Sequence, residues 1–239
     1  MTLETIDFIN GILLLFIITI SVIVGLKIIS LYFKNKEKVY IFAGLTWIFL
    51  VCPWYPHSTA FITILTTGQR LTPEVYFILG NIFIPIAIIL WLYAFTELCY
   101  KKKQKIIIGV YFVYAIVVYI LFFYFLLTDP NIIGELQGDI EVQYSRLVVI
   151  YYITILVTIL ITGVIFGIES MKSKIPEVKL RGKLIIIAFF SYVIGIMIDA
   201  ILDHTILSLM LVRALEMSSV IEFYTAFIMP EFLKRRLIK

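Results

Sequence analysis

The sequence is poor in charge and in the residues that bind metals. Charged residues make up 15% of its 239 residues, well below the roughly 25% of soluble proteins. It has two histidines and two cysteines, whereas a zinc site usually takes three or four ligands at fixed positions. It has no phosphate-binding loop, nucleophile elbow or paired-cysteine motif. We therefore expect no catalytic residues, no metal, no cofactor and no enzymatic activity.

The few cysteines and histidines carry little further information. Cys52 and Cys99 have no metal-binding spacing and fall in apolar segments, so we predict two free, buried thiols. The histidines are His57 and His204, the latter directly after Asp203. These side chains are too few for a convincing zinc centre.

Apolar residues are abundant instead, at 62% of the chain. A run of about 20 apolar residues crosses the hydrocarbon layer of a membrane as a helix, and backbone groups in lipid must bond within their own segment. The sequence predicts an all-α integral membrane bundle of seven transmembrane helices in a single domain, residues 1–239. The predicted spans are 8–33, 39–64, 76–99, 106–127, 147–168, 184–203 and 206–229.

The charges between these segments are sorted by sign. Basic residues gather in alternate loops: Lys34, Lys36, Lys38, Lys101, Lys102, Lys103, Lys105, Lys172, Lys174, Lys179, Arg181, Lys183, Lys234, Arg235, Arg236 and Lys239. The opposite side holds Arg70, Arg146 and eight acidic residues: Glu4, Asp7, Glu74, Asp129, Glu135, Asp139, Glu141 and Asp203. Positive residues flank cytoplasmic ends, so we expect the N-terminus outside, the C-terminus in the cytoplasm and a multi-pass location in the cell membrane.

The basic loops restrict the expected partners. Their lysines attract anionic lipid of the bilayer, and docking of a cytosolic signalling protein is the alternative that the sequence leaves open. Nucleic-acid binding is not expected, because the basic residues are tied to membrane edges. Retinal is not expected either, because the seventh segment contains no lysine for a Schiff base.

The longest outer loop runs from Thr128 to Arg146. Asp129-Pro130-Asn131 is a turn signal, and Gly134 and Gly138 break regular structure. This loop is too short for a separate domain and has room for one helical turn. On the inner side, the loop 169–183 contains Pro176 and has room for an extension of the fifth helix.

The last two spans carry charged residues at membrane depth. Arg213 and Glu216 are three residues apart and face the same side of a helix. Counting about 1.5 Å per residue from the turn at Asp203-His204-Thr205 places Asp199 about 8 Å and Arg213 about 13 Å deep, within reach of the arginine side chain. A buried arginine needs a carboxylate. We predict an ion cluster that locks the two helices, or alternatively a site for a ligand or a proton.

The second span contains two prolines three residues apart, Pro53 and Pro56. They remove backbone donors and should bend the helix at Trp54, Tyr55 and His57. Such a bend at membrane depth is tolerated in packed protein or beside a cavity. We expect either a packed kink or a pocket wall, and Asn81 on the third span is placed to face the same cavity.

Several motifs resemble a known family. They are Trp47, Gly80–Pro85, Trp91–Glu97, Lys101–Lys103 and the ending Ser218–Lys234. Together with the helix count, they resemble the seven-helix sensory region at the N-terminus of many histidine kinases, in the stand-alone form of archaeal relatives. The resemblance implies a membrane sensor that signals to a cytosolic output, although no kinase follows in this sequence and no residue of defined function carries over.

We therefore expect a receptor-like membrane sensor that relays a signal to a separate cytosolic protein. Its candidate ligand-binding residues are Trp54, Tyr55, His57, Asn81, Asp199, Arg213 and Glu216. A transporter or channel for ions or small solutes is the alternative. A continuous polar path from Asp199 through Glu216 to Glu222 and Glu97 would favour it. Arg213 and Glu222 are nine residues apart, however, and point in roughly opposite directions on a helix.

Overall fold

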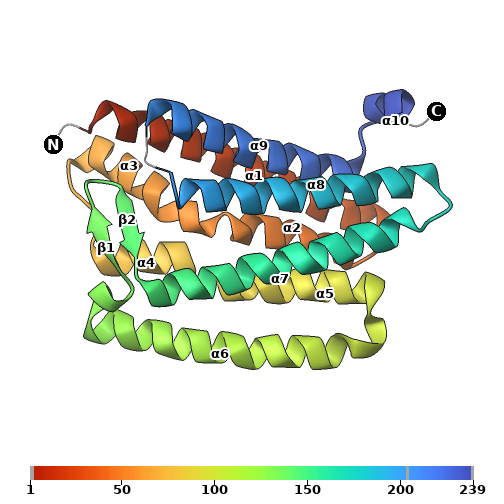
Figure 1. The fold of residues 1–239 in the computed structure, drawn as a ribbon, viewed down its shortest axis with the longest axis horizontal. Coiled ribbons are helices and arrows are strands. Elements are labelled where there is room, and N and C mark those ends of the chain that lie inside the picture. The colour runs from red at the N-terminus through yellow and green to blue at the C-terminus, as the bar shows by residue number, and fades with distance from the viewer. Residues whose placement is uncertain (1–2, 203–204, 238–239) are drawn as a thin grey trace.

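A computed structural model describes residues 3–202 and 205–237, which form a bundle of long helices running side by side (Figure 1). Asp203 and His204, and with them the centre of the predicted turn between the last two spans, lie outside the described residues. The described chain is helical apart from one two-stranded hairpin. The predicted all-α class is therefore confirmed.

The elements follow the predicted order. They are α1 (Thr5–Asn35), α2 (Val39–Leu50), η1 (Cys52–Trp54), α3 (Tyr55–Thr67), α4 (Pro73–Asn81), α5 (Ile84–Cys99), η2 (Lys101–Lys103), α6 (Gln104–Thr128), η3 (Pro130–Ile132), β1 (Gly134–Gln137), β2 (Glu141–Tyr144), α7 (Arg146–Met171), α8 (Pro176–Asp199), α9 (Ile206–Ile228) and α10 (Glu231–Leu237).

Six of these helical segments are long and apolar enough to cross a membrane, as in a multi-pass membrane protein. They are Thr5–Asn35, Val39–Thr67, Pro73–Cys99, Lys101–Thr128, Arg146–Met171 and Pro176–Asp199. The seventh predicted span is α9, whose 23 residues are long enough. Arg213, Glu216 and Glu222 make α9 too charged to be identified as a span by length and composition alone.

The inner connection between α7 and α8 is shorter than the predicted loop 169–183. Helix α7 continues to Met171, and α8 already begins at Pro176. Proline suits the first turn of a helix because it has no N–H to leave unpaired. The charged residues from Glu177 to Lys183, which were expected in the loop, belong to the first two turns of α8.

The outer loop between α6 and α7 contains the expected helical turn, η3, and also a hairpin that the sequence analysis did not predict. Strands β1 and β2 pair antiparallel. Gly134 permits their close approach, because a Cβ there would lie 2.7 Å from the Gln143 carbonyl oxygen. Gly138 has φ +62° at the turn, a conformation that glycine adopts readily.

Two of the long segments are interrupted near their centres. The second changes from α2 through η1 into α3 at Pro53 and Pro56, which confirms the predicted bend. The third is divided into α4 and α5 at Ile82 and Phe83, just before Pro85. Proline lacks an N–H, and its ring clashes with the carbonyl four residues earlier, so each break occurs where the helix cannot continue undisturbed.

Side chains bond to the carbonyl groups around the breaks, some from the broken segments themselves and some from α6 and α8. The last carbonyls of a helix have no partner within it. The donors are Tyr55 Oη to Ile48 O (2.6 Å), Tyr192 Oη to Leu50 O (2.8 Å), Cys52 Sγ to Gly80 O (3.2 Å) and Tyr119 Oη to Ile82 O (2.6 Å). The Cys52 bond joins the two breaks directly. Both predicted free thiols are present, Cys52 buried and Cys99 only partly buried.

The apolar interior consists of two clusters. The larger is built around Trp47, Trp91, Phe189 and Phe223, from α2, α5, α8 and α9. The smaller lies at the hairpin end and includes residues of α3, α4, the hairpin and the adjoining ends of α6 and α7. The boundary between them follows the two breaks. The hairpin, α3, α4 and the adjoining ends of α6 and α7 therefore pack as a unit of their own. We call this unit the outer cap, after the orientation predicted from the sequence.

The basic and acidic loops lie at opposite ends of the bundle. The α1–α2, α5–α6 and α7–α8 connections and α10 are at one end, and the hairpin, the N-terminus and the α3–α4 connection are at the other (Figure 1). The charge sorting seen in the sequence is therefore a property of the folded molecule.

The hydrogen bonds at the breaks predict a specific stability loss. Replacing Tyr192 with Phe leaves the buried Leu50 carbonyl without this donor, which should lower the free energy of unfolding by about 1–3 kcal/mol. Reversible unfolding in mixed detergent micelles measures this. The matched control is Tyr124→Phe on the exposed face of α6, which should have little effect. Equal stability of the two variants would contradict the assigned role of Tyr192.

Candidate functional site

The most unusual feature of the bundle is a buried ion cluster on α9. A capping box between Thr205 and Ser208 starts this helix, and Arg213 and Glu216 follow two turns later. Their side chains are 3% and 1% exposed. Ionised groups are seldom buried so completely unless they are paired, so their contacts determine how this part of the bundle is held together.

The Arg213 guanidinium joins three helices. Its Nε donates to Asn10 Oδ1 on α1 (3.2 Å), and its Nη1 donates to Asp199 Oδ2 on α8 (3.1 Å) and to Glu216 Oε2 on α9 (2.7 Å). The ion pairs predicted from the depths of Asp199 and Arg213 are therefore present. Binding of a ligand by these residues stays a prediction.

A glycine makes room for the cluster. Gly195 on α8 faces α9, and a Cβ there would lie 3.0 Å from Glu216 Cγ. The Glu216 Oε1 oxygen is buried and has no hydrogen-bond partner among the described residues. The site therefore combines a well-coordinated guanidinium with a carboxyl group of which only one oxygen is bonded.

Trp54 and Tyr55 belong to the break in the second segment. Trp54 is buried with its ring edge-on to Tyr192, and Tyr55 donates to the Ile48 carbonyl. These contacts correspond to the packed kink, one of the two structures expected for this segment. Neither residue lines the pocket described below.

His57 and Asn81 lie farther toward the outer cap. The His57 ring is tilted against Tyr76, with 5.6 Å between ring centroids. Asn81 Oδ1 accepts from Tyr152 Oη (2.8 Å), and its Nδ2 donates to the Phe77 carbonyl (2.9 Å). The seven predicted site residues are thus divided among the ion cluster, the break and the outer cap, with His57 in electrostatic range of Arg213 and Asp199. None of the seven lines the pocket described below.

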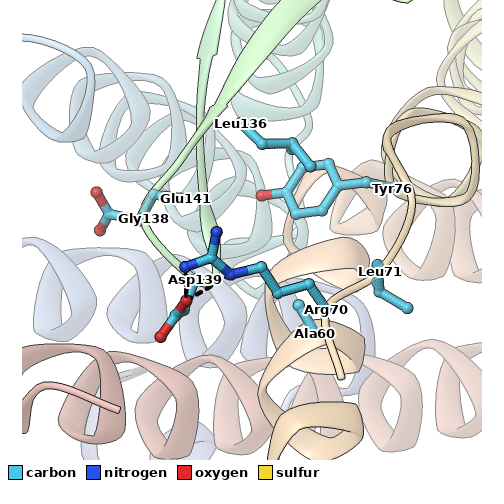
Figure 2. A pocket seen from close by; sticks show the side chains of 8 residues that line it. All are labelled: Ala60, Arg70, Leu71, Tyr76, Leu136, Gly138, Asp139 and Glu141. Atoms are coloured by element: carbon cyan, nitrogen blue, oxygen red, sulfur yellow. Dashed lines mark hydrogen bonds and ion pairs between the residues drawn. The ribbon is translucent and has the colours of Figure 1, made fainter. Parts of the chain in front are cut away.

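A small pocket of about 60 Å³ lies at the outer cap, below the hairpin (Figure 2). This volume has room for a few water molecules. Its walls are Ala60, Arg70, Leu71, Tyr76, Leu136, Gly138, Asp139 and Glu141. Arg70 reaches across to Asp139, and its Nε donates to Asp139 Oδ1 (2.6 Å). Tyr76 Oη donates to the Ile140 carbonyl (2.9 Å), so the two contacts hold the hairpin to the α3–α4 connection and to α4.

The base of the hairpin is held by Tyr144, a partly buried residue whose hydroxyl group is fully buried. A Cβ on Gly80 would lie 3.1 Å from the Tyr144 hydroxyl, so this glycine leaves space for the ring. Burial raises the pKa of Tyr144 to about 12, and the hydroxyl stays protonated at physiological pH. The hairpin is therefore anchored by neutral contacts at its base and by the Arg70–Asp139 ion pair near its tip.

Sequence analysis missed Asn10 and the pocket residues. Asn10 is a polar residue within the first apolar segment, a signal of the kind that singled out Asp199. Its partner is not evident, because α1 and α9 are separated by nearly the whole chain. The pocket depends on the unpredicted hairpin. Among the described residues, no group of three or more His, Cys, Asp or Glu side chains is arranged to hold a metal ion.

No protein-family model matches the sequence, and no curated protein matches it either. Functional inference therefore depends on the geometry described above.

Breaking the buried ion pairs of Arg213 should lower the free energy of unfolding much more than breaking an exposed ion pair. Arg213→Met leaves Asp199, Glu216 and Asn10 without their donor and should lower the free energy of unfolding by about 3–5 kcal/mol. Arg70→Met removes a pair whose arginine side chain is 50% exposed and should cost no more than about 1 kcal/mol. Unfolding in mixed micelles compares the two variants, and similar losses would contradict the structural importance of Arg213.

Proposed function

We propose that this chain is a seven-helix sensor of the cell membrane that relays a signal from its acidic end to a separate cytosolic protein at its basic end. The observation that carries the proposal is the pairing of α8 and α9, which are linked by charged contacts at both ends. At the acidic end, Arg213 of α9 bonds to Asp199 of α8 (3.1 Å). These two helices also contact each other along their length.

At the basic end, α8 bonds to the last turn of α9. Arg181 Nη1 donates to the carbonyls of Ala226 (3.3 Å) and Phe227 (2.5 Å). Glu177 accepts from Arg181 (2.8 Å) and pairs with Lys234 of α10 (2.6 Å). The hydrogen bond between Lys234 and Glu177 raises the pKa of the Lys234 amino group. A shift of α9 against α8 would therefore alter the position of α10.

Orientation follows from the charge distribution. If the basic end faces the cytoplasm, the ion cluster and outer cap lie toward the outside. Arg213 bonds to Glu216 within α9, to Asn10 of α1 and to Asp199 of α8. Its partners lie inside the bundle, which supports a crossing of α9 as the seventh span. The exposed lysines and arginines of the inner loops and α10 then offer a basic surface to an acidic cytosolic protein or to anionic lipid.

The resemblance to the sensory region of histidine kinases supports the same proposal. A sensor transmits a signal when its stimulus binds two packings of the helices with different affinity. The two breaks supply places where the outer cap can move against the inner half of the bundle. The unbroken helices α8 and α9 supply the connection to the cytoplasmic end.

Coupling between the two ends is testable without knowing the stimulus. In a Cys99→Ser background, a cysteine at exposed position 235 of α10 is labelled with a water-soluble maleimide. Asp199→Asn at the far end of α8 should change the labelling rate by about fivefold or more, the smaller end of typical coupling energies. Circular dichroism confirms that each variant is folded at the labelling temperature.

The matched control is Arg70→Gln, which removes an ion pair at the same end of the bundle but away from α8 and α9. It should leave labelling at position 235 unchanged. If Asp199→Asn also leaves the rate unchanged, the two ends are not coupled through α8 and α9, and the sensor proposal loses its main support.

A transporter for ions or small solutes is the second candidate, and the two interrupted segments favour it. Discontinuous helices near the membrane centre often form transport sites, with free backbone carbonyls as ligands. Here the carbonyls of Ile48, Leu50, Gly80 and Ile82 accept bonds from protein side chains. Glu97 is bonded to Lys101 and Gln104 at the basic end, which does not favour the polar path described above.

Flux measurements distinguish the two candidates. Liposomes containing the purified protein should transport protons and alkali cations no faster than protein-free liposomes. A transporter would instead show flux that depends on protein and falls in Arg213→Met. Such flux would replace the sensor proposal with the transport function.

A further inference from the structure

Glu216 is the buried carboxyl group whose bonding is least complete in the ion cluster. Its Oε2 accepts from Arg213 (2.7 Å), while its Oε1 is buried and has no donor among the described residues. A buried carboxylate is stable when its oxygens accept several hydrogen bonds. An ionised Glu216 would leave half of its charge without compensation in an apolar setting, where such a defect is costly.

The positive charge available to Glu216 is shared. Arg213 Nη1 donates to Glu216 and also to Asp199 Oδ2, so two carboxyl groups on neighbouring helices use the same nitrogen. Asp199 is the more accessible of the two, with a side chain 21% exposed against 1% for Glu216. Burial disfavours the charged form of a carboxyl group, so the ionised partner of Arg213 should be Asp199.

The other groups around Glu216 add no second positive charge at this site. Helix α1 contributes the neutral Asn10, and α8 contributes Asp199 and, in electrostatic range of Glu216, Tyr192. From α3, His57 lies in electrostatic range of Arg213 and Asp199. Gly195 of α8 packs against the Glu216 side chain itself. Within the described part of the chain, Arg213 is therefore the one cation bonded to this carboxyl group.

We propose that Glu216 is a proton-binding site, with a proton held on Oε1 in the structure described here. The group is then a neutral carboxylic acid: the O–H bond forms at Oε1, and Oε2 remains the acceptor for Arg213. Loss of the proton to water leaves a full negative charge beside Arg213. That charge competes with Asp199 for the guanidinium, and so changes the bond that holds α9 to α8.

The proton-binding site is inferred from the ion cluster alone. That proton binding acts as the stimulus of the protein rests in addition on the proposed sensor function. As a sensor, the protein would respond to pH: proton release at Glu216 would weaken the α8–α9 contact at the outer end and shift α9 along its length. A proton is the ligand that fits, because Oε1 of Glu216 is buried without a donor among the described residues, and Glu216 does not line the pocket of the outer cap.

Infrared spectroscopy and thermal unfolding test the site directly. Purified protein in lipid nanodiscs should show the carbonyl stretch of a protonated, buried carboxyl group, shifted in D₂O. We expect Glu216→Gln to abolish this band, and Glu222→Gln, a control with another buried carboxyl oxygen on the same helix, to retain it. Raising the pH should remove the band in wild type.

Thermal unfolding separates a neutral acid from a permanent ion pair. Glutamine resembles the protonated acid, so Glu216→Gln should melt within about 2 °C of wild type at neutral pH. Asp199→Asn removes the charge that balances Arg213, so this variant should melt about 6 °C or more below wild type. The inference is overturned if Glu216→Gln melts as low as Asp199→Asn or fails to fold, or if the infrared band survives it. These outcomes leave the labelling test of the sensor proposal unaffected.

Discussion

Polar groups inside this bundle must find partners within the protein, and this requirement shapes the structure more than any apolar contact. Water is absent from the core of a membrane, where an unpaired carbonyl or N–H costs several kcal/mol. Two proline-interrupted segments create such unpaired carbonyls near the middle of the bundle. Tyr192 on α8 and Tyr119 on α6 each supply a hydroxyl to one of them, so these helices are fixed against the breaks by hydrogen bonds as well as by packing.

The same requirement explains the arrangement around Arg213. One guanidinium inside the bundle needs several acceptors, and no single helix offers them all in range. Asn10, Asp199 and Glu216 come from three helices, and the resulting bonds bring the first and the last apolar segments of the chain together. Gly195 allows α8 and α9 to approach closely enough for this. A residue that is costly to bury thus determines which helices are neighbours.

Features that depend on residues close together in the sequence were predicted correctly. Apolar runs located the helices, and two prolines located the bend. Counting residues from the predicted turn paired Asp199 with Arg213, because consecutive helices joined by a short connection are usually neighbours. Sequence reasoning failed where partners are distant in the chain. Asn10 has no signal that points to α9, and four-residue strands such as β1 are formed by pairing with β2 over the outer cap rather than by an apolar pattern. The break before Pro85 was not predicted either, since the third span was expected to be continuous over 76–99. Tyr119 and Cys52, which bond to the carbonyls beside this break, are distant from it in the sequence.

The way in which the bundle satisfies its polar groups bears on its function. Carbonyls that already accept bonds from Tyr192, Tyr119 and Cys52 are poor ligands for a passing ion, which favours a protein that changes shape over one that conducts. Within the ion cluster, Glu216 has one oxygen that accepts a bond from Arg213 and one without a donor among the described residues. In the proposed site the second oxygen holds a proton, and loss of that proton would strengthen the attraction between Glu216 and Arg213. Because Arg213 connects α9 to both α1 and α8, a change at this carboxyl group reaches three helices through one bond.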